Sequence, residues 1–529
     1  MGSGRRRTRR CDSPRHRKTN DERACQRSLE ATHTRLHVTV IVVGRQLFFG
    51  PYYPQSVNPL AGLERIREES EELATAFATA GYSLYAVGGC IRDVFLQTDA
   101  RFDDIDYTTN ARPDDILALL RPLCSATWEM GREFGTIGGQ LRSTQRKVEI
   151  TTFRTESYSD DSRKPEVVFG DDIMVDLVRR DFTINAMAFD LITPQLVAPN
   201  NALSDLNAKV LRTPMDARVV FSEDPLRMLR AARFLSRFEF EIDPDVETAA
   251  HELADRIAIV SAERVRGELD LLMMTPRPSL GLDFIVRTGL AAHFLPELPG
   301  LALEQDPIHH HKDVLTHTYA VVEKVRRSVD PTEDEPQGAS NLVVRLAALF
   351  HDVGKPKTRA FTDKGVTFHG HDHVGARMTK KRMTALKYSQ QMIDDVSKLV
   401  ELHLRFHTYA MGWSDAAVRR YVRDAGHLLE ELNELTRCDC TTRNRRKAQE
   451  LDRRMNELEA RIAELREKED LDSQRPALSG DQVMAILGLS PSRAVGEALS
   501  FLLEIRHEEG EISEEEATER LLAWWSSRS

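Results

Sequence analysis

The chain has 529 residues, which is long enough for three or four domains with sizeable hydrophobic cores. Its net charge of −10 argues against a uniformly basic nucleic-acid-binding protein but leaves room for a local basic face. The six cysteines show neither metal-finger nor disulfide-framework spacing, so we expect a reducing, cytoplasmic location. Since no apolar run reaches the about 18 residues of a transmembrane helix, we expect no membrane partner.

The first 55 residues differ in composition from the rest of the chain. Residues 1–27 are rich in Arg, Ser and Thr and poor in large apolar residues, which predicts disorder. Residues 36–49 are more apolar and predict a strand or a short helix. We interpret residues 1–55 as an unstructured extension, and a basic arm that contacts RNA is the alternative.

The chain is organised around a strand, a glycine pair and a helix. An amphipathic helix is predicted over 57–81, followed by a buried strand over 84–87. Gly88 and Gly89 then break the strand, and 90–96 has helical spacing of apolar residues. Backbone N–H groups and a helix N-terminus in this arrangement can hold a phosphate.

Two aspartates, Asp104 and Asp106, follow this stretch with one apolar residue between them. Residues two apart on a strand point to the same face, so both carboxylates converge on one spot. Two hard oxygen ligands beside a phosphate cradle suit a Mg²⁺-assisted attack on a nucleotide.

A helix is predicted over 114–121, and a strand pair over 134–141 and 147–154. Glu149 lies in the second strand between apolar neighbours. It is either solvent-facing or a third carboxylate of the metal site, and the pattern favours neither. The polar residues 155–164 show no apolar period and predict a mobile loop beside the site.

Arg179 and Arg180 lie in the string Leu-Val-Arg-Arg-Asp-Phe-Thr-Ile-Asn-Ala-Met. Paired arginines can hold a triphosphate, and Asn185 in the same string can hydrogen-bond a sugar or a phosphate. An Arg-Arg pair alone usually lies on the surface, but the longer string favours a functional site.

A further helix is predicted to begin with Ser222 as its N-cap. Asp224 and Arg227 are three residues apart and therefore neighbours on one helix face, as in many surface ion pairs. Such a pair also fits cytosine and adenine, because a carboxylate accepts from the exocyclic amine and a guanidinium donates to the ring nitrogen. Uracil and guanine present the reverse pattern, so the pair would admit CTP and ATP and reject UTP and GTP.

Together these segments resemble the class II nucleotidyltransferases, which include the bacterial-type tRNA CCA-adding enzymes and their poly(A) polymerase relatives. The resemblance runs from about residue 57 to the C-terminus, with Ile91 in place of the valine of Gly-Gly-x-Val-Arg-Asp. A helical Glu-Arg-x-x-x-Glu-Leu element at Glu263, Arg264 and Glu268 is also similar. Two further matches are the metal-binding Asp104 and Asp106, and Glu223 matches the nucleotide-selecting motif. The resemblance implies nucleotide binding by Gly88, Gly89, Arg92, Asp93, Arg179, Arg180, Asp181, Asn185, Asp224, Arg227 and Arg230.

The resemblance implies a multidomain α/β and all-α protein with a small mixed-sheet head followed by helical parts. The expected boundaries are 56–195 for the head, 196–305 for a nucleotide-selecting, RNA-binding neck, 306–440 for the next domain and 441–529 for a tRNA-binding body and tail. It implies addition of CMP, CMP and AMP from CTP and ATP to the 3′ end of tRNA. Asp104 and Asp106, with or without Glu149, would hold two Mg²⁺ ions. Gly88, Gly89, Arg92 and Arg180 would contact phosphate or ribose.

The residues from 306 onward are rich in histidine. An apolar helix over 341–350 delivers His351 and Asp352, with His317 upstream and Asp439 downstream. This pattern resembles the HD domain of metal-dependent phosphohydrolases, whose ligands match His317, His351, Asp352 and Asp439. His371 and His403 are candidate ligands of a second metal, and we expect surface or supporting roles for His309, His310, His311, His369, His373 and His407. Imidazole and carboxylate suit Mn²⁺, Ni²⁺, Fe²⁺ or Co²⁺.

The C-terminal part has a heptad seam, at Leu451, Met455, Leu458, Ile462 and Leu465. The seam is short, so an intramolecular helical hairpin is favoured over a dimer, and both monomer and homodimer stay open. The residues after 477 resemble the RNA-contacting tail of the family, and we expect them to grip tRNA by shape.

Other functions remain open. Poly(A) polymerases and enzymes that add only CC or only A share the head and neck motifs. A signalling protein whose main work is HD phosphohydrolysis, with a regulatory nucleotidyltransferase head, is the alternative of another class. Against it, Asp224 and Arg227 would reject UTP, and the C-terminus does not look like paired sensor domains. A pure RNA-binding scaffold is least supported, because both metal-ligand sets are complete.

Overall fold

The computed structural model describes residues 42–43, 46–47, 59–96, 105–157, 166–303, 313–325, 339–362, 365–441, 444–469, 475–510 and 512–528. Asp104 and nearly all of residues 1–55 lie outside these ranges, so the predictions for them stay predictions. The chain divides into two compact units, one of residues 1–208 with 212–215 and one of residues 209–211 with 216–529. The first unit thus includes residues beyond the expected head boundary at residue 195.

A seven-stranded mixed sheet forms the centre of the first unit. In spatial order its strands are β11 (Gln195–Val197), β10 (Ala188–Asp190), β3 (Leu84–Val87), β4 (Asp106–Thr109), β7 (Lys147–Thr152), β6 (Thr136–Leu141) and β5 (Cys124–Trp128). All neighbours in this sheet pair antiparallel except β4 and β7, which are parallel. The helices of the unit are α2 (Leu60–Glu69), α3 (Glu71–Thr79), α4 (Gly89–Leu96), α5 (Pro113–Leu123), α6 (Ile173–Val178) and α7 (Ala202–Ala208), with a 3₁₀ turn η2 (Thr183–Asn185).

The single helix predicted over 57–81 is wrong, because α2 and α3 are separated at Ser70. This serine has the non-helical angles φ −111° and ψ 5° and is 1% exposed. Its hydroxyl donates to the carbonyl of Ile66 and lies 2.9 Å from the hydroxyl of Tyr107 on β4. A buried polar contact to the sheet therefore overrides the continuous apolar period, since serine competes for backbone partners inside helices.

The loop predicted over 155–164 is partly a strand. β8 (Arg154–Ser157) and β9 (Glu166–Phe169) pair antiparallel, with Thr155 opposite Val168. The middle of the predicted loop lies outside the described residues. The polar composition of the stretch hid the hairpin, because the sequence offers no period-2 apolar pattern there.

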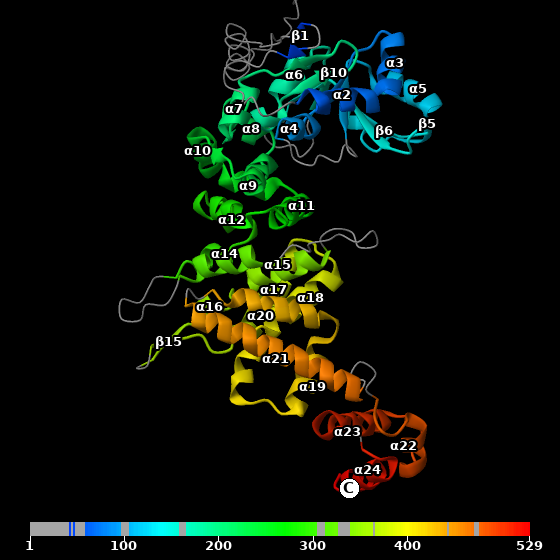
Figure 1. Cartoon of the computed structure of the whole chain (residues 1–529), viewed down its shortest axis with the longest axis vertical. Coiled ribbons are helices and arrows are strands. Elements are labelled where there is room, and N and C mark those ends of the chain that lie inside the picture. The colour runs from blue at the N-terminus through cyan, green and yellow to red at the C-terminus, as the bar shows by residue number, and fades with distance from the viewer. Residues whose placement is uncertain are drawn as a thin grey trace, which may run out of the picture. The chain divides into compact units, whose positions relative to one another are not determined.

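Helices make up most of the second unit (Figure 1). The first group comprises α8 (Ala217–Glu223), α9 (Leu226–Phe238), α10 (Pro244–Glu252), α11 (Ala262–Met273), α12 (Pro278–Arg287) and α13 (Ala291–Phe294). The second comprises α14 (Val314–Lys324), α15 (Ala339–Phe350), α16 (Lys355–Thr358), α17 (His371–Ala385), α18 (Gln390–Leu402), the 3₁₀ stretch η5 (Arg405–Met411), α19 (Asp415–Ala425), α20 (Leu429–Asp439) and α21 (Arg445–Glu469).

The second group is built around α15, which contacts α14, α17, α18 and α20. Its residues 344 and 346–350 are at most 1% exposed, so this part of the helix is buried on every side. The turn after α15 presents His351 and Asp352 at the middle of this bundle, as the sequence predicts.

The predicted heptad seam packs inside the chain. Met455, Leu458, Ile462 and Leu465 on α21 are all at most 5% exposed. The helix contacts α19 and α20, and α20 precedes it directly in the chain. The favoured intramolecular hairpin is therefore what the structure shows, and the seam is used without a second copy.

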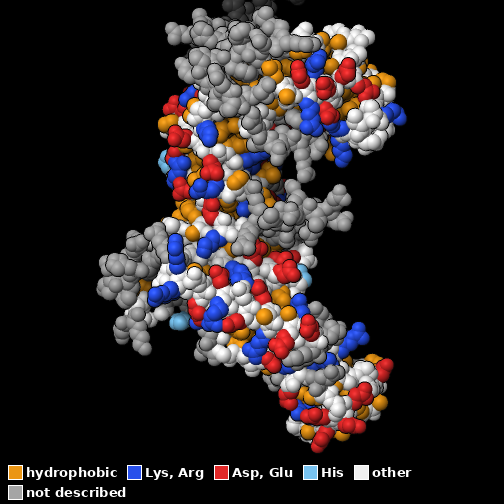
Figure 2. Space-filling view, viewed as in Figure 1, with side chains coloured by type: hydrophobic (Ala, Val, Ile, Leu, Met, Phe, Trp, Pro, Cys, Tyr) orange, Lys and Arg blue, Asp and Glu red, His pale blue; other side chains and the backbone are white. Residues whose placement is uncertain are grey.

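Three short helices, α22 (Gly480–Leu487), α23 (Arg493–Glu509) and α24 (Glu514–Ser526), form a small bundle with its own core. Ser479 begins α22 with a capping box to Gln482. Figure 2 shows acidic side chains gathered on the visible face of this bundle, and α24 opens with Glu514, Glu515 and Glu516. Contact of these helices with RNA therefore stays a prediction that the charge of this face does not favour.

Among the described residues, no helix is both long and apolar enough to cross a membrane. The architecture of a mixed-sheet head with a large helical remainder agrees with the fold class expected from the sequence.

Candidate functional site

Asp106 and Glu149 lie side by side in the sheet. They face one another across the parallel pair β4–β7, and Asp106 is also opposite Val87 on β3. Both side chains are exposed, while the next residue on each strand, Tyr107 and Ile150, is buried. Alternation along a strand therefore places the two carboxylates on the same open face. Glu149 is solvent-facing and lies next to Asp106, while its place as a third carboxylate of the metal site stays a prediction.

The predicted phosphate cradle starts directly beside these carboxylates, where β3 ends. Gly88 has a φ of +76°, which side chains rarely permit, and an added Cβ would lie 3.2 Å from Nη1 of Arg180. Arg180 also contacts Asp176 at 3.2 Å, while its buried Nε has no hydrogen-bond acceptor among the described residues. A guanidinium that passes so close to a glycine turn is well placed to bind a phosphate.

Three residues predicted to bind nucleotide form a buried network with one another. Arg92 is 4% exposed and donates from Nη1 to Oδ1 of Asn185 at 2.5 Å. Asn185 donates in turn to Oδ1 of Asp181 at 2.9 Å, so the network ties α4 to η2. We infer that these side chains position the cradle, and their direct contact with nucleotide stays a prediction.

Two further predicted residues border this network. Asp93 accepts from Nε of Arg92 at 2.8 Å, and Nη1 of Arg179 donates to the carbonyl of Arg154 at 2.9 Å. Cys90 lies between the cradle and Asp106. Burial, followed by the negative charge of Asp106, raises the pKa of this thiol to about 12, so it is uncharged at neutral pH.

The helix start predicted at Ser222 is wrong. Helix α8 runs through Ser222 and Glu223, the chain turns extended at Asp224 with φ −140° and ψ 100°, and α9 begins at Leu226. The cause is Pro225, which disfavours the helical conformation in the residue before it and cannot donate a helical hydrogen bond. Asp224 instead occupies the break, where its Oδ1 accepts from the N–H of Leu226 at 3.1 Å.

Each member of the predicted base-selecting pair has a charged partner in the same unit. Nη2 of Arg264 on α11 donates to Oδ2 of Asp224 at 2.8 Å. Nη1 of Arg227 donates to Oε2 of Glu223 at 3.2 Å, and Arg227 is 9% exposed. The pair is thus held in place from both sides.

The Glu-Arg-x-x-x-Glu-Leu element supplies the first of these contacts, from Arg264 to Asp224. Glu268 of the same element is 7% exposed. It accepts from Nε of Arg233 at 2.7 Å and from Nη1 of Arg230 at 3.4 Å. Arg230, predicted to bind nucleotide, is therefore attached to α11. The sequence signalled this element by its motif, but the motif alone does not reveal which residues it contacts.

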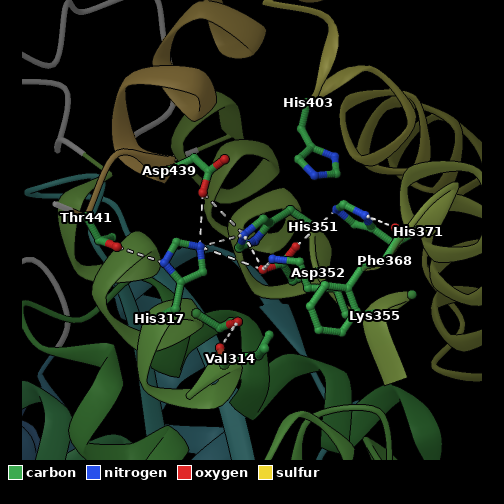
Figure 3. A network of polar contacts seen from close by, with 12 residues as sticks. Val314, His317, His351, Asp352, Lys355, Phe368, His371, His403, Asp439 and Thr441 are labelled. Atoms are coloured by element: carbon green, nitrogen blue, oxygen red, sulfur yellow. Dashed lines mark hydrogen bonds and ion pairs between the residues drawn. The ribbon is translucent and has the colours of Figure 1, made fainter. Parts of the chain in front are cut away.

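A second site lies in the bundle around α15. The structure brings all six predicted ligands together, and Figure 3 shows how they converge. They form two groups whose ligand atoms lie within 4.8 Å of one another, His317 with His351 and Asp439, and Asp352 with His371 and His403. The groups are adjacent, because Nε2 of His351 is 3.3 Å from Oδ2 of Asp352.

The four histidines share one orientation. Each Nδ1 lies 2.6–2.8 Å from an oxygen, which is the hydroxyl of Thr441 for His317 and the carbonyls of Ala348, Phe368 and Val400 for His351, His371 and His403. A carbonyl only accepts, so Nδ1 of the latter three carries the proton and Nε2 offers a lone pair to the centre. Among the described residues, Nε2 of His371, Nε2 of His403 and Oδ1 of Asp352 are buried without a hydrogen-bond partner, although Nε2 of His371 and Oδ1 of Asp352 face each other at 3.4 Å. These orphaned atoms fit a divalent cation.

Electrostatics also favour a metal. Burial by itself would raise the pKa of Asp352, but the neighbouring His351, His371 and Lys355 hold it well below its usual range. The pKa of Asp439 is likewise held low against burial, mainly by His317 and His407. Burial, followed by the charge of His351, lowers the pKa of His403 to about 4, so this imidazole is neutral at pH 7. Burial would lower the pKa of His351, but Asp352 and Asp439 raise it, so a metal there would displace its second proton. The two ionised carboxylates and the neutral imidazole of His403 are already in the forms that bind metals.

Two basic side chains lie next to this centre: Lys355, which was given no role from the sequence, and His407, which was expected in a surface or supporting role. Lys355 places Nζ 2.6 Å from Oδ2 of Asp352, and His407 places Nε2 3.7 Å from Oδ2 of Asp439 with 52% of its side chain exposed. His373 is exposed and pairs with Glu401 at 3.2 Å. His309, His310 and His311 lie outside the described residues.

Three family models match parts of this chain. Residues 84–212 match the poly(A) polymerase head domain, residues 239–301 a probable RNA- and SrmB-binding site of polymerase A, and residues 314–467 the HD domain. The HD match continues past the expected boundary at residue 440 and includes most of α21.

Curated relatives agree with these matches. An A-adding tRNA nucleotidyltransferase of Deinococcus radiodurans is 36% identical over 341 residues, which cover 63% of this chain and 74% of the relative. A CCA-adding enzyme of Geobacillus stearothermophilus is 36% identical over 223 residues, which cover 42% of this chain and 52% of that enzyme. The chain thus spans about half the length of the CCA-adding relative that it matches.

Among solved structures, the Bacillus stearothermophilus CCA-adding enzyme in complex with CTP has a TM-score of 0.60 and 21% identity, covering 87% of this chain and 98% of the other. At this identity the likeness shows a shared fold. The Deinococcus relative, the head match and the HD match together show the family. The chain belongs to the tRNA nucleotidyltransferases and poly(A) polymerases, in a form that carries an HD domain.

Proposed function

We propose that this protein adds CMP, CMP and AMP to the 3′ end of tRNA, using CTP and ATP and releasing pyrophosphate. The observation that carries the proposal is the register of Asp106 with Glu149, directly beside the turn where Arg180 crosses Gly88. Carboxylates and a guanidinium thus meet over the central strands β3, β4 and β7, an arrangement that supports transfer of a nucleotidyl group. A cytoplasmic location is proposed with this reaction.

Mg²⁺ fits the carboxylates of the head. Asp106 and Glu149 offer exposed oxygens from neighbouring strands, and Asp104 is proposed to add a third carboxylate. Bound Mg²⁺ would lower the pKa of the attacking 3′-hydroxyl and neutralise the triphosphate. Arg180 would hold the triphosphate, while the buried network around Arg92 fixes the turn that presents it.

Base selection is assigned to Asp224 and Arg227. Asp224 would accept from the exocyclic amine of cytosine or adenine, and Arg227 would donate to the ring nitrogen. Their contacts with Arg264 and Glu223 hold both groups in a fixed orientation, which is the condition for rejecting UTP and GTP.

Addition of AMP alone is the second candidate. It is favoured by the Deinococcus relative, an A-adding enzyme that is matched over 74% of its length. Poly(A) synthesis remains a third possibility within the same chemistry.

An extension assay separates these activities. Purified protein with Mg²⁺ is given labelled tRNA that ends at the discriminator base, at C or at CC, with each nucleoside triphosphate alone and with CTP plus ATP. CCA addition predicts extension of all three tRNAs to the same length when both nucleotides are present. Extension of only the CC-ended tRNA would establish A addition, and long ladders with ATP would establish poly(A) synthesis. No extension of any tRNA would contradict the proposal.

We also propose metal-dependent phosphoester hydrolysis at the HD site. The supporting observation is the convergence of four Nε2 atoms and two carboxylates, three of whose atoms are buried without a hydrogen bond. This set of imidazole and carboxylate donors suits Mn²⁺, Ni²⁺, Fe²⁺ or Co²⁺, which would activate a water molecule for attack on phosphorus. Lys355, beside Asp352, is placed to bind the phosphate.

Hydrolysis of nitrophenyl phosphomonoesters and phosphodiesters with each metal tests this proposal, together with the metal content of the protein. Wild-type protein is expected to retain metal and hydrolyse one class of ester, and His351→Ala to lose both. Failure of the wild-type protein to bind any of the four ions would contradict the proposed hydrolysis.

A further inference from the structure

A small cavity lies between η5 and α19 in the second unit, apart from the ligands of the metal centre. Its volume is about 160 Å³, and its polar and aromatic lining comes from Arg405, Thr408, Trp413, Arg420, Tyr421 and Asp424. Sites for drug-sized ligands occupy about 300–1,000 Å³, so this cavity suits one base rather than a nucleoside triphosphate.

The aromatic wall of the cavity is held in place. Trp413 donates from its indole N–H to Oγ1 of Thr408 at 3.2 Å, and its carbonyl accepts from Nη1 of Arg461 at 2.7 Å. Its ring lies 5.4 Å from the ring of Tyr421, at an angle of 53°. Tyr421 is itself fixed by a 2.7 Å hydrogen bond from its hydroxyl to Asn433. A pre-ordered indole is a surface on which a base can stack at low entropic cost.

A carboxylate and a guanidinium complete the lining. Nη1 of Arg405 is 3.4 Å from Oδ2 of Asp424, which is longer than the about 2.7–2.9 Å of a tight charge-assisted hydrogen bond. Oδ1 of Asp424 also accepts from Nη2 of Arg423, at 3.3 Å. Both contacts of this carboxylate are long, so the donor of a ligand can compete for it. A carboxylate beside a guanidinium matches a base that has an exocyclic amine next to a ring nitrogen acceptor.

We propose that this cavity binds a single adenine or cytosine base, stacked on Trp413 and read by Asp424 and Arg405. The carboxylate would accept from the amine and the guanidinium would donate to the ring nitrogen, while uracil would leave both groups mispaired. The base belongs either to a free nucleotide or to an RNA strand, because both present the same edge. The site is separate from the head and does not depend on nucleotidyl transfer.

Binding is measured with full-length protein in EDTA, which removes the Mg²⁺ that triphosphate binding in the head requires. The probes are tritiated adenosine by equilibrium dialysis, and fluorescent A₆, C₆ and U₆ by anisotropy. Trp413→Leu and Asp424→Asn are compared with the controls Trp525→Leu and Asp394→Asn, which change the same residue types elsewhere. Circular dichroism of each variant checks its fold.

We expect A₆ and C₆ to bind about tenfold more tightly than U₆, and both Trp413→Leu and Asp424→Asn to abolish that preference while the controls keep it. Binding of adenosine identifies a free nucleotide as ligand, and binding of the oligonucleotides alone identifies RNA. If the Trp413→Leu variant does not fold, the preference of the Asp424→Asn variant for A₆ over U₆ decides the question. Equal affinity for A₆ and U₆, an unchanged preference in the variants, or no binding of either probe would overturn the proposal.

Discussion

Asp224 lies at a break between two helices, where Pro225 ends α8 and the chain restarts as α9. Its carboxylate is oriented by the N–H of Leu226 and by Arg264, which is 40 residues further along the chain. A base-reading carboxylate must not swing away when an unsuitable base arrives, since discrimination depends on leaving buried groups unpaired. We therefore infer that Arg264 positions Asp224 for the base selection proposed above.

Replacing Arg264 by methionine tests this role. The variant is expected to incorporate UTP and GTP more readily, lowering the ratio of CTP to UTP incorporation by about tenfold, because Asp224 loses one of its two restraints. Single-nucleotide incorporation rates give the ratio. Arg277→Met, which removes an arginine that is 48% exposed on the same unit, should leave it unchanged. An unchanged ratio in Arg264→Met would show that Asp224 needs no such support.

The sequence largely predicted which residues carry the candidate site, but it could not predict which side chains contact one another. Motif matches identified Asp224, Arg264 and Glu268, but only the structure shows that Arg264 holds Asp224 and that Glu268 holds Arg233. The N-cap predicted at Ser222 is wrong. Serine is a good capping residue, but Pro225, three positions later, breaks the helix after Glu223 and not before it.

At the scale of elements, the pairing of β4 with β7 brings Asp106 to Glu149. A strand was predicted over 147–154, and Asp106 was expected on a strand, but the adjacency of β4 and β7 could not be predicted, because β7 comes after α5, β5 and β6 in the chain. Only the parallel register decides which residue of β7 faces Asp106, and a shift of one residue would turn Glu149 to the other face. This is why the role of Glu149 stayed open in the sequence.

Helix α15 is attached to α11 by one buried arginine. Arg345 is 3% exposed and donates to the carbonyls of Met273 and Thr275 at the C-terminal end of α11, at 2.8 Å for Thr275. Those carbonyls have no helical partner, and a cation at a helix C-terminus also complements the dipole. Arg345 therefore joins the helix that carries the HD ligands to the helix that supports base selection.

Arg345→Met is expected to lower the free energy of unfolding by about 2 kcal/mol, because two buried carbonyls lose their donor. Urea unfolding followed by tryptophan fluorescence measures the change. Lys357→Met, which removes an exposed cation nearby, serves as the control and should change the free energy little. A stability equal to that of the wild type would mean that the contact contributes no net stabilisation.

At the scale of the molecule, the two proposed activities use separate ligand sets in separate units. The carboxylates of the head lie in the first unit and the HD ligands in the second. The sequence predicted both sets, since each is marked by short motifs. It could not reveal the cavity beside Trp413, whose lining is collected from η5 and α19 by their packing.

His351→Ala is expected to abolish metal-dependent hydrolysis and leave tRNA extension within about twofold of wild type, since no residue of the head contributes to the HD ligand groups. The two reactions are measured in parallel on the same preparation. His373→Ala, an exposed histidine outside both ligand groups, should retain hydrolysis. Loss of extension in His351→Ala would show that the activities are coupled.

The measurement that bears most directly on the central claim is the rate of CMP incorporation by Asp106→Asn and Glu149→Gln at saturating Mg²⁺ and CTP. If the two carboxylates jointly hold the metal, each variant loses about a hundredfold or more in rate, with hydrolysis at the HD site unchanged as the control for folding. Glu133→Gln, another glutamate of the head, should incorporate normally. Wild-type incorporation by Glu149→Gln, or by Asp106→Asn, would contradict a catalytic site built on the pairing of β4 with β7.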